Sequence, residues 1–338
     1  MQSSIPPVLV NGLPGKMATE TARAIKASPD IALYNYALTG NSSTRSIKID
    51  GVKVHLYNPS QRIFFAADSM CARKFAVDYT SPESAIGNAA FYVNDDMPFV
   101  MGTTGFPREK LDAIMQGAQI PAVVASNMAL PIVALQRFME DYSKQNAGSL
   151  TGSSLKIRES HQASKKDTSG TAKAMIKYFV LLGVPMNTED INQFQKIRGR
   201  ESLEFGVPEE YLEGHGWHLY YVSNPNSQNK GLEKLYSGLE DLFRSPAFSA
   251  YDINQDGDIS DSIGIIAKSK EKDVVFQAVH NTSSDGGSLV LRHNVNGRGI
   301  YARGTLEALR FLKAVEIDGR PNKVYSMIDV LDFIEKTS

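Results

Sequence analysis

The residues best suited to chemistry are gathered between positions 159 and 172, in the segment ESHQASKKDTSGTA. His161 can donate or accept a proton near neutral pH, and Lys165 brings a full positive charge to the same segment. A proton donor beside a cation suits the binding and protonation of a small anion. The alternative interpretation is a lysine-rich surface loop whose charges only face water.

A helix is predicted directly after this segment, because apolar residues recur at helical spacing over residues 172–180. Ser169 is placed to cap the helix start, which would leave the backbone N–H groups of Gly170 and Thr171 without partners inside the helix. Free N–H groups and the helix dipole both favour an anion at such a position. The sequence therefore predicts a site for a small carboxylate, with His161 as the acid beside it.

The composition excludes several classes of function. The chain has 338 residues, enough for two domains, and its 42% hydrophobic and 22% charged residues are ordinary for a soluble globular protein. The formal net charge of −1 predicts neither nucleic acid nor membrane among the partners. A single cysteine, Cys71, excludes an internal disulfide and fits a reducing compartment. No leader pattern and no bilayer-length apolar run is found, so we expect a cytoplasmic protein.

The first segment has the pattern of a dinucleotide-binding turn. An apolar strand at residues 8–10 leads through Gly12 and Gly15 into a helix that ends near residue 27. The two glycines would let the backbone approach a pyrophosphate, which the helix start would bind. Ala18 stands where the usual third glycine allows close packing, a role that a small residue can serve.

The next strand, predicted at residues 31–38, bears on the choice of cofactor. Hydroxyl residues and Arg45 follow it, where many NAD enzymes carry an acidic residue for the ribose 2′-hydroxyl. Arg45 suits a 2′-phosphate instead, which favours NADPH over NADH. Alternatively, Arg45 only lies on the surface of a loop.

Strands and helices alternate throughout the first part of the chain, which predicts a largely parallel, doubly wound sheet. Apart from a β-hairpin around Asp50-Gly51, the further strands are expected at residues 75–80, 98–101 and 121–125. Ligands bind at the carboxyl ends of the strands in such sheets, so the loops that start at Gly12, Gly102 and Ala125 should converge on one site.

The second part of the chain has a different character. The polar stretch 146–154 is interpreted as a linker after a helix over residues 129–145. Strands are then predicted at residues 155–158, 191–197, 215–222, 274–279 and 288–295, and late helices at residues 305–312 and 326–335.

The predicted fold class is α/β: an N-terminal Rossmann-type doubly wound parallel sheet, followed by an α+β domain with an open mixed β-sheet. The dinucleotide-binding domain would comprise residues 1–130 completed by 303–338, and the substrate-binding and oligomerisation domain residues 131–302.

A polar insert of mixed character is expected at about residues 224–272. It contains a predicted helix at residues 232–243 and the segment DINQDGDIS, which begins at Asp252 and resembles a calcium-binding loop. The bidentate glutamate of such loops is missing, because Ile263 stands at its position. His215 and His218 would face opposite sides of a strand. We therefore assign no metal.

The motifs, taken in order, resemble a known family. They are GxxGKM from Gly12, DYTSP from Asp78, GTTGF from Gly102, the pair Asn127-Met128, and ESHQxxKxDxSGTA from Glu159. This set is similar to the 4-hydroxy-tetrahydrodipicolinate reductase (dihydrodipicolinate reductase) family of the lysine and diaminopimelate pathway. The pair His161-Gln162, where many bacterial members have two histidines, resembles the plant-type branch.

The resemblance implies a reaction and a set of site residues. NADPH or NADH would reduce a cyclic dicarboxylate, with His161 as the general acid and Lys165 polarising the substrate. Substrate contacts are implied for Gln162, Ser169, Gly170, Thr171 and Arg298. Cofactor contacts are implied for Gly12, Leu13, Pro14, Gly15, Lys16, Met17, Arg45, Asp78, Thr80, Gly102, Thr103, Thr104, Ala125, Ser126, Asn127 and Met128.

The family resemblance also implies a homodimer or homotetramer formed through the C-terminal sheet. Two alternative functions remain open from the sequence. One is a related NAD(P)H-dependent reductase that acts on another cyclic imine carboxylate. The other is a non-catalytic nucleotide-binding protein with a calcium-responsive insert.

Overall fold

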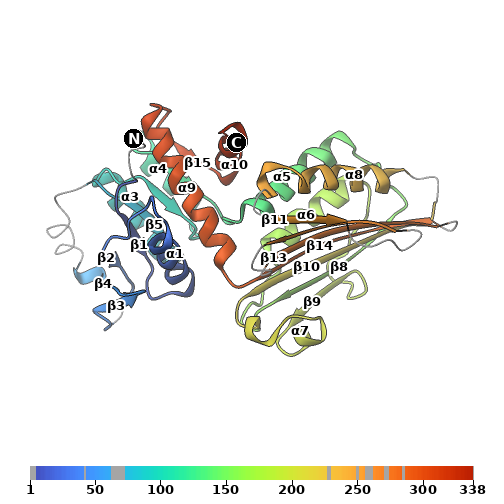
Figure 1. Ribbon diagram of the computed structural model, residues 1–338, viewed down its shortest axis with the longest axis horizontal. Coiled ribbons are helices and arrows are strands. Elements are labelled where there is room, and N and C mark those ends of the chain that lie inside the picture. Colours follow the sequence, from blue (N-terminus) through green and yellow to red (C-terminus); the bar gives the residue numbers. More distant parts are fainter. Residues whose placement is uncertain are drawn as a thin grey trace. The chain divides into compact units, whose positions relative to one another are not determined.

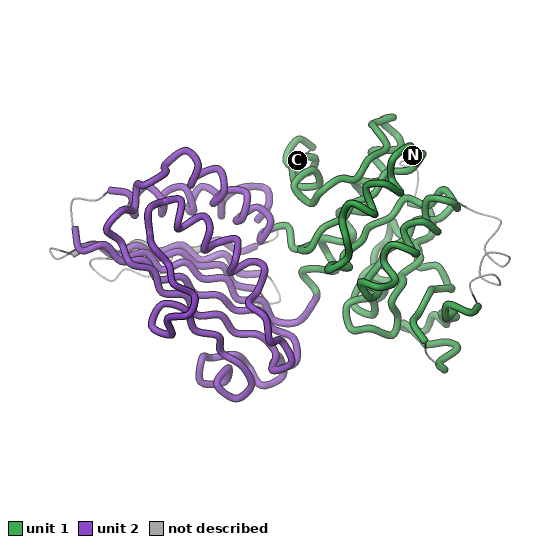
Figure 2. Tube along the Cα trace, turned by 180° about the vertical axis from the view of Figure 1, so that it is seen from behind, with its two compact units in different colours: residues 1–130, 299–337 green, residues 131–298, 338 purple. Residues whose placement is uncertain are grey.

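The computed structural model describes residues 5–41, 43–61, 73–226, 230–248, 251–255, 262–269, 274–283 and 286–337. The chain divides into two compact units (Figure 2): unit 1 is formed by Met1–Leu130 with Gly299–Thr337, and unit 2 by Pro131–Arg298. Cys71 lies outside the described residues.

The prediction that residues 146–154 form a linker is wrong, because this stretch is packed into unit 2. Leu150 is fully buried, and the N–H groups of Gly148 and Leu150 donate to the carbonyls of Leu181 and Leu182 at 3.0 and 2.8 Å. Small polar residues here make tight turns against a helix end rather than a flexible connection.

Unit 1 is built on a five-stranded sheet in which every neighbouring pair is parallel, as predicted. Its strands are almost entirely apolar and buried, which is expected where helices cover both faces of a parallel sheet. In spatial order the strands are β1 (Val8–Asn11), β5 (Phe75–Asp78), β6 (Phe99–Met101), β7 (Ala122–Val124) and β15 (Val324–Tyr325).

Helices lie on both faces of this sheet (Figure 1). On one face α1 (Lys16–Ala27) packs against α9 (Gly299–Ile317), with α10 (Met327–Thr337) beside α9. On the other face α3 (Pro82–Asn94) and α4 (Arg108–Met115) bury Tyr92, Leu111 and their apolar neighbours in one hydrophobic cluster.

The second predicted strand of unit 1 is shorter than expected. Only β2 (Tyr36–Leu38) is regular, and it pairs with β4 (Val52–Tyr57) in a small separate sheet that also contains β3 (Ser46–Ile49). The β3–β4 hairpin turns at Asp50 and Gly51, whose φ angles of 43° and 89° are those of the predicted tight turn.

Unit 2 contains a seven-stranded mixed sheet, in which β8 and β9 pair in parallel and the other described pairs are antiparallel. The predicted fold class is therefore confirmed in both parts. In spatial order the strands are β11 (Tyr251–Gln255), β12 (Ser262–Ser269), β13 (Val274–Ser283), β14 (Gly286–Asn296), β10 (His215–Asn224), β8 (Ser154–His161) and β9 (Phe194–Arg198).

One face of this sheet is covered by α5 (Leu130–Gln145), α6 (Gly170–Leu181) and α8 (Gly231–Phe243), as Figure 1 shows. Short helix α7 (Glu201–Glu204) follows the edge strand β9, and single turns of 3₁₀ helix occur at Pro59–Gln61, Glu209–Tyr211 and Pro246–Phe248. The side chains that face the helical layer include Tyr220, which contacts Phe179 of α6 with ring centroids 6.0 Å apart.

The stretch predicted as a polar insert is an integral part of unit 2. Its helix α8 buries Leu232, Leu235 and Leu239 against the sheet, and β11 and β12 extend the sheet at its edge. The first four positions of the suspected calcium loop, from Asp252, lie in strand β11 rather than in a loop. The rest of that loop lies outside the described residues.

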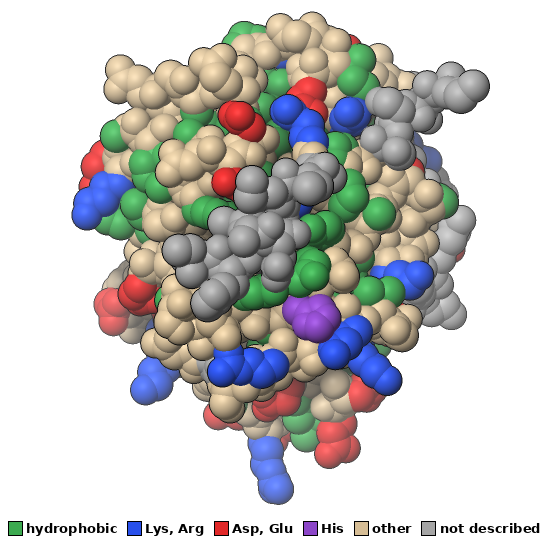
Figure 3. All heavy atoms as spheres, turned by 90° about the vertical axis from the view of Figure 1, so that its left-hand side faces the viewer, with side chains coloured by type: hydrophobic (Ala, Val, Ile, Leu, Met, Phe, Trp, Pro, Cys, Tyr) green, Lys and Arg blue, Asp and Glu red, His purple; other side chains and the backbone are tan. Residues whose placement is uncertain are grey.

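Charged side chains are interspersed on the face of the molecule drawn in Figure 3, where basic and acidic groups are not separated by sign. This distribution agrees with the net charge of −1.

Gly304 in α9 marks a close approach between backbones in unit 1. A Cβ added there would lie 1.6 Å from the carbonyl oxygen of Met128, at the loop that follows β7.

Gly304→Ala should therefore lower the melting temperature, because an overpacking cost of about 1–3 kcal/mol or more exceeds the gain in helix propensity of about 1 kcal/mol. Thermal unfolding followed by circular dichroism measures the effect. Gly40→Ala is the control, since a Cβ there meets nothing within 4 Å. Equal shifts in both variants would contradict the close approach.

Candidate active site

The turn between β1 and α1 is tight, as the glycine pattern predicts. Gly12 has a φ of 99°, and a Cβ there would lie 2.3 Å from the carbonyl oxygen of Tyr79, so only glycine fits. Gly15 precedes the first residue of α1, and its N–H donates to the Gly12 carbonyl at 2.8 Å. Ala18 is fully buried, in agreement with the close-packing role predicted for it.

The loops at the carboxyl ends of β1, β5 and β6 lie close together. Tyr79 packs against Gly12 through its backbone and against Gly102 through its ring, where a Cβ would lie 2.2 Å from a ring carbon. The Tyr79 hydroxyl is 2.6 Å from the Thr305 hydroxyl, and burial raises its pKa to about 12. This phenol is therefore neutral at physiological pH and acts as packing between two glycine loops.

The side chain of Asp78 connects these loops through hydrogen bonds. Its carboxylate is fully buried and accepts hydrogen bonds from Thr80, Asn88, Tyr92 and Thr103, at 2.7–3.0 Å. These contacts join the end of β5 to α3 and to the loop after β6. We refer to these five residues as the Asp78 network.

Asn11 connects this network to β1 and β2. Its side-chain amide donates to the Tyr92 hydroxyl at 2.7 Å and accepts from the Leu38 N–H at 2.7 Å. The Asp78 network is therefore linked, through Tyr92 and Asn11, to β1 and β2.

The residues predicted to contact the cofactor differ in exposure. Those that reach solvent are Pro14, Gly15, Lys16, Arg45, Thr104 and Ser126; Gly12, Met17, Thr80, Gly102, Ala125 and Asn127 are half-buried, and Leu13, Asp78, Thr103 and Met128 are buried. Asn127 also has a local role, because its side chain accepts from the Ala129 N–H at 2.9 Å.

The predicted anion site at the start of α6 has the expected local structure. Ser169 caps the helix, its hydroxyl accepting from the Ala172 N–H at 2.9 Å. Within the part of the chain that the structure describes, the N–H groups of Gly170 and Thr171 donate to no acceptor. Nothing lies within 4 Å of the position that a Cβ of Gly170 would take. The helix start is therefore open toward solvent and able to bind an anion.

Lys165 lies in the loop before this helix and is paired with Asp167 at 3.0 and 3.1 Å. The hydrogen bond from Lys165 lowers the pKa of the Asp167 carboxyl. Because Asp167 is 68% exposed, water screens this pair and its contribution is small. Lys166 is exposed.

Gln162 and Arg298 lie in different parts of unit 2. Gln162 is half-buried next to His161, and its backbone carbonyl accepts a hydrogen bond from the backbone N–H of Lys165 at 3.0 Å. Arg298 follows the end of β14 and donates to the Glu213 carbonyl at 3.3 Å. Its guanidinium also lies against Gly214, where a Cβ would be 2.7 Å away.

Two residues without a predicted role, Glu159 and Arg198, surround His161. Glu159 is fully buried on β8, and its carboxylate accepts from Arg198 at 2.9 Å and from the Ser169 N–H at 3.2 Å. It also lies 3.4 Å from Nδ1 of His161. The spacing of two residues on a strand could have indicated that Glu159 and His161 share a face. The sequence marks Arg198 and Arg200 as a local basic cluster that could attract an anion, but it gave no indication that Arg198, on β9, contacts Glu159.

A cluster of histidines lies beside this pair. His218 on β10 stacks on His293 of β14, with centroids 4.4 Å apart, and meets His161 edge-on at 5.1 Å. His218 Nε2 is 2.7 Å from the Ser169 hydroxyl. Since that hydroxyl already accepts from the helix, its own proton is available to His218. The sequence predicted correctly that His215 and His218 point to opposite faces; His215 bonds to Ser160 at 2.8 Å instead.

Burial makes these histidines hard to protonate. It is the main cause that lowers the pKa of His161 to about 3, with the positive charges of Arg198 and Lys165 adding to it. Burial also lowers the pKa of His293 to about 3 and that of His218 well below its usual value. Each of these rings is neutral at pH 7 when no anion is bound.

The donor atoms of Glu159, His161 and His218 lie within 4.8 Å of one another, a spacing that could admit a cation. The guanidinium of Arg198 already contacts the carboxylate, and the Ser169 hydroxyl contacts His218. A metal ion would therefore meet a neighbouring positive charge, and our prediction that no metal binds is retained.

A glycine turn at the edge of a parallel sheet, and an acid beside an open helix start, place this protein among the nicotinamide-dependent oxidoreductases. Two family models match it: "Dihydrodipicolinate reductase, N-terminus" over residues 6–128 and "Dihydrodipicolinate reductase, C-terminus" over residues 132–331. The chain belongs to the dihydrodipicolinate reductase family.

Named relatives are similar over most of their length. The chain is 32% identical to "Probable 4-hydroxy-tetrahydrodipicolinate reductase 2, chloroplastic" of Oryza sativa subsp. japonica, covering 96% of this chain and 82% of the relative. It is also 32% identical to "4-hydroxy-tetrahydrodipicolinate reductase 1, chloroplastic" of Arabidopsis thaliana, covering 96% and 77%.

A solved structure supports the fold alone. "Dipicolinate bound Dihydrodipicolinate reductase from Paenisporosarcina sp. TG-14" superposes with a TM-score of 0.52 at 12% identity, covering 95% of this chain and 97% of that one. Among the described residues, no helix combines the length and the apolar content needed to cross a membrane.

The neutral histidines predict how stability depends on pH. In the unfolded chain a histidine titrates near pH 6.5, whereas the pKa values of His161 and His293 in the folded state are about 3. The unfolded state therefore binds more protons between these values, and the free energy of unfolding should fall as the pH drops below about 6.5. Each such histidine contributes a slope of up to about 1.4 kcal/mol per pH unit.

Urea unfolding between pH 7.5 and pH 5 measures this slope. His293→Phe keeps an aromatic ring in the stack and removes one titrating group, so its slope should be smaller than that of the wild type. Identical slopes in the two proteins would show that His293 is not held neutral.

Proposed function

We propose that this protein catalyses the NAD(P)H-dependent reduction of 4-hydroxy-tetrahydrodipicolinate (dihydrodipicolinate) to tetrahydrodipicolinate in lysine and diaminopimelate biosynthesis. Relatives that carry this enzyme's name align with 96% of the chain. The observation that carries the proposal is the open start of α6 beside His161 and Lys165, which offers an acid, a cation and free N–H groups to one small dicarboxylate.

Unit 1 would serve as the dinucleotide-binding domain. The N–H groups at the start of α1 and the backbone of Gly12–Met17 suit the pyrophosphate, while the loops after β6 and β7 suit the ribose and nicotinamide. Asp78 and Thr103 would position these loops rather than contact the cofactor, because their side chains are buried and hydrogen-bonded to each other. The exposed Arg45 favours the 2′-phosphate of NADPH over NADH.

Unit 2 would bind the substrate. The N–H groups of Gly170 and Thr171 would hold one carboxylate, and Lys165 would exchange its exposed partner Asp167 for the substrate. The bound nicotinamide supplies a hydride to a ring carbon. His161 would give its proton to the nitrogen-linked carbanion or enamine that forms as the hydride arrives.

Removal of the acid should separate chemistry from cofactor binding. His161→Ala is expected to lower kcat by about 10²–10⁴-fold, because the proton must then come from water. The assay follows NADPH oxidation with the condensation product of pyruvate and aspartate semialdehyde. Affinity for NADPH, measured by fluorescence titration, should stay at the wild-type value. Unchanged turnover would remove His161 from the mechanism.

The same assay tests the identity of the substrate. A related reductase would prefer another cyclic imine carboxylate in a panel of such compounds. Wild-type protein that oxidises NADPH with another imine, and not with the condensation product, would replace the proposed substrate while leaving the reaction class unchanged.

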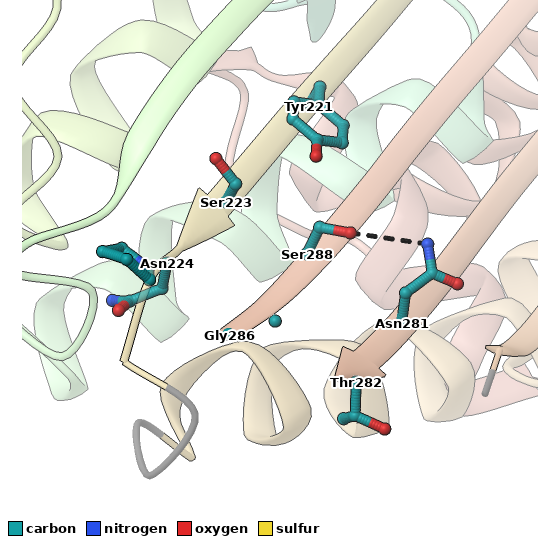
Figure 4. A pocket seen from close by; sticks show the side chains of 9 residues that line it. Tyr221, Ser223, Asn224, Asn281, Thr282, Gly286 and Ser288 are labelled. Carbon is teal, nitrogen blue, oxygen red and sulfur yellow. Dashed lines mark hydrogen bonds between the residues drawn. The ribbon is translucent and has the colours of Figure 1, made fainter. Parts of the chain in front are cut away.

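We further propose that the protein forms a homodimer or homotetramer through the sheet face of unit 2 that points away from α5, α6 and α8. Tyr221, Val290 and Val279 are directly paired across β10, β14 and β13, and they form a partly exposed apolar row on that face. Hydroxyl and amide side chains, among them Ser223, Asn281 and Ser288, line a pocket at the end of the row (Figure 4). An apolar centre with a polar margin is typical of protein interfaces.

A charge placed in this row should weaken self-association. Val290→Lys is expected to lower the molar mass measured by light scattering after size exclusion, because lysine would be buried at the interface. Val180→Lys is the matched control, since Val180 is 50% exposed on helix α6. A monomeric wild type, or a V290K variant with unchanged mass, would contradict the proposal.

The single cysteine fits a reducing compartment, and a cytoplasmic location remains our prediction.

A further inference from the structure

The environment of Glu159 is unusual because it combines complete burial with four polar neighbours, three of which come from other segments. One carboxylate oxygen, Oε1, accepts from Arg198 at 2.9 Å. The other, Oε2, accepts from the Ser169 N–H at 3.2 Å and lies 3.4 Å from His161 Nδ1 and 3.7 Å from His218 Nε2. A buried carboxylate is retained only where such partners offset its desolvation.

Arg198 fixes this carboxylate in place. Its guanidinium donates to Glu159 and to four backbone carbonyls, those of Glu159, Lys165, Asp167 and Ile197, at 2.8–3.4 Å. One side chain of β9 therefore holds the Glu159 carboxylate and the loop that carries Lys165. The planar fork of an arginine can satisfy these acceptors together, which a lysine cannot do.

The geometry around His161 constrains where the ring carries its proton. Nδ1 of His161 is buried and has no hydrogen-bond partner among the described residues. The side chain as a whole keeps 12% of its surface exposed. An unprotonated Nδ1 would direct its lone pair at the carboxylate of Glu159, which is repulsive. A protonated Nδ1 needs only a small ring rotation to donate to Oε2.

We propose that Glu159 is a positioning residue: it accepts the Nδ1 proton of His161 and thereby leaves Nε2 as the nitrogen that takes up and delivers the proton used in reduction. Arg198 holds the carboxylate in the orientation that this requires. The inference deepens the proposed function and rests on it for the delivery step, while the Nδ1–H form of the ring is a property of the protein alone.

The charges around His161 explain why such a residue is needed. Arg198 and Lys165 lie near the ring, from β9 and from the loop between β8 and α6, and the ring of His218 meets it from β10. His215 on the opposite face of the sheet and His293 on β14 also lower its pKa through their charge. Together with burial, the positive groups lower the pKa of His161 to about 3. Glu159 is the carboxylate that opposes them at contact distance.

A bound dicarboxylate would add negative charge on the other side of the ring. Protonation of Nε2 then produces an imidazolium held between the substrate and Glu159. The proton passes from Nε2 to the substrate as the hydride arrives, and His161 returns to its neutral Nδ1–H form. The substrate thus gains the hydride of the reduced nicotinamide and one proton, and a proton taken up from the solvent recharges Nε2 before the next cycle, so that each reduction consumes one hydride and one solvent proton.

The test uses full-length protein and the variants Glu159→Gln and Glu159→Asp. Glu159→Gln keeps the size of the side chain and removes its charge. We expect kcat to fall by between about 10- and 1,000-fold, with the KM for NADPH unchanged. The limb of the pH–rate profile that requires protonated His161 should move to lower pH, because the imidazolium loses its counter-charge. Glu159→Asp should recover part of the rate and of the profile.

Ser160→Ala is the matched control. Ser160 is equally buried on the adjacent position of β8 but faces the other side of the sheet, where it bonds to Ser202 and His215. This variant loses buried hydrogen bonds without touching the Glu159 carboxylate, so it should lower stability and keep the wild-type pH–rate profile. A Glu159→Gln variant with the wild-type profile would overturn the proposal.

A second measurement depends neither on activity nor on the Glu159 variants. Nitrogen-15 NMR of histidine-labelled wild-type protein distinguishes a ring protonated at Nδ1 from one protonated at Nε2, with the His161 signal assigned by its loss in His161→Ala. We expect the Nδ1–H form at pH 7, and the Nε2–H form would overturn the proposal. Wild-type protein without reductase activity would refute the proposed function, whereas the NMR result would still decide the Glu159 contact.

Discussion

A buried carboxylate at the end of β8 is the constraint on which the rest of unit 2 depends. Taking an ionised carboxylate out of water costs several kcal/mol even after the protein relaxes, so Glu159 requires partners with fixed positions. Arg198 and the Ser169 N–H supply them. Satisfying this one group brings together β8, β9 and the start of α6, and with them His161, Lys165 and the open N–H groups of the helix.

Unit 1 also contains a buried carboxylate that orders the segments around it. Asp78 is also fully buried at the end of a strand, and its carboxylate gathers Thr80, Asn88, Tyr92 and Thr103 from neighbouring segments. In both units a carboxylate that never reaches solvent orders a loop that does. Loops that bind ligands cannot be stabilised by their own exposed residues, because these must remain free to exchange partners. The ordering group therefore lies one layer deeper, where water does not compete for its hydrogen bonds.

The sequence predicted well whatever depends on local chemistry. Apolar runs and glycine turns located the parallel strands, the Asp50-Gly51 hairpin, and the cap at Ser169, because each is decided by a few adjacent residues. Patterns that depend on distant contacts were less informative. In β10, for example, the face packed on the helices carries the even residues His218 and Tyr220, whereas the odd residue Tyr221 is exposed on the other face. Arg198 could be noticed only as part of a basic pair with Arg200, because its contact with Glu159 arises only when β9 pairs with β8.

The stretch around Asp252 shows why local resemblance misleads. Its alternating oxygen side chains match a metal-binding loop, yet alternation with a period of two is equally the pattern of a strand, and pairing with β12 decides for the strand. The polar stretch 146–154 is similar: small residues permit both a flexible linker and a tight turn, and the burial of Leu150 selects the turn. In each case backbone contacts with another segment, β12 for the first stretch and the end of α6 for the second, decide what the local composition left open.

Electrostatics completes the argument for how a neutral histidine can serve as an acid. In the protein alone, burial and the nearby cations keep the His161 ring neutral, so it carries no second, acidic proton that solvent could remove. In the reaction that we propose, the same cations would attract the dicarboxylate, and that ligand would bring the negative charge that makes protonation of the ring favourable. Binding and acidity would then be coupled, because His161 would become charged only when the substrate is bound. A permanently charged acid in this position would repel Arg198 and Lys165 and loosen the loop that binds the substrate.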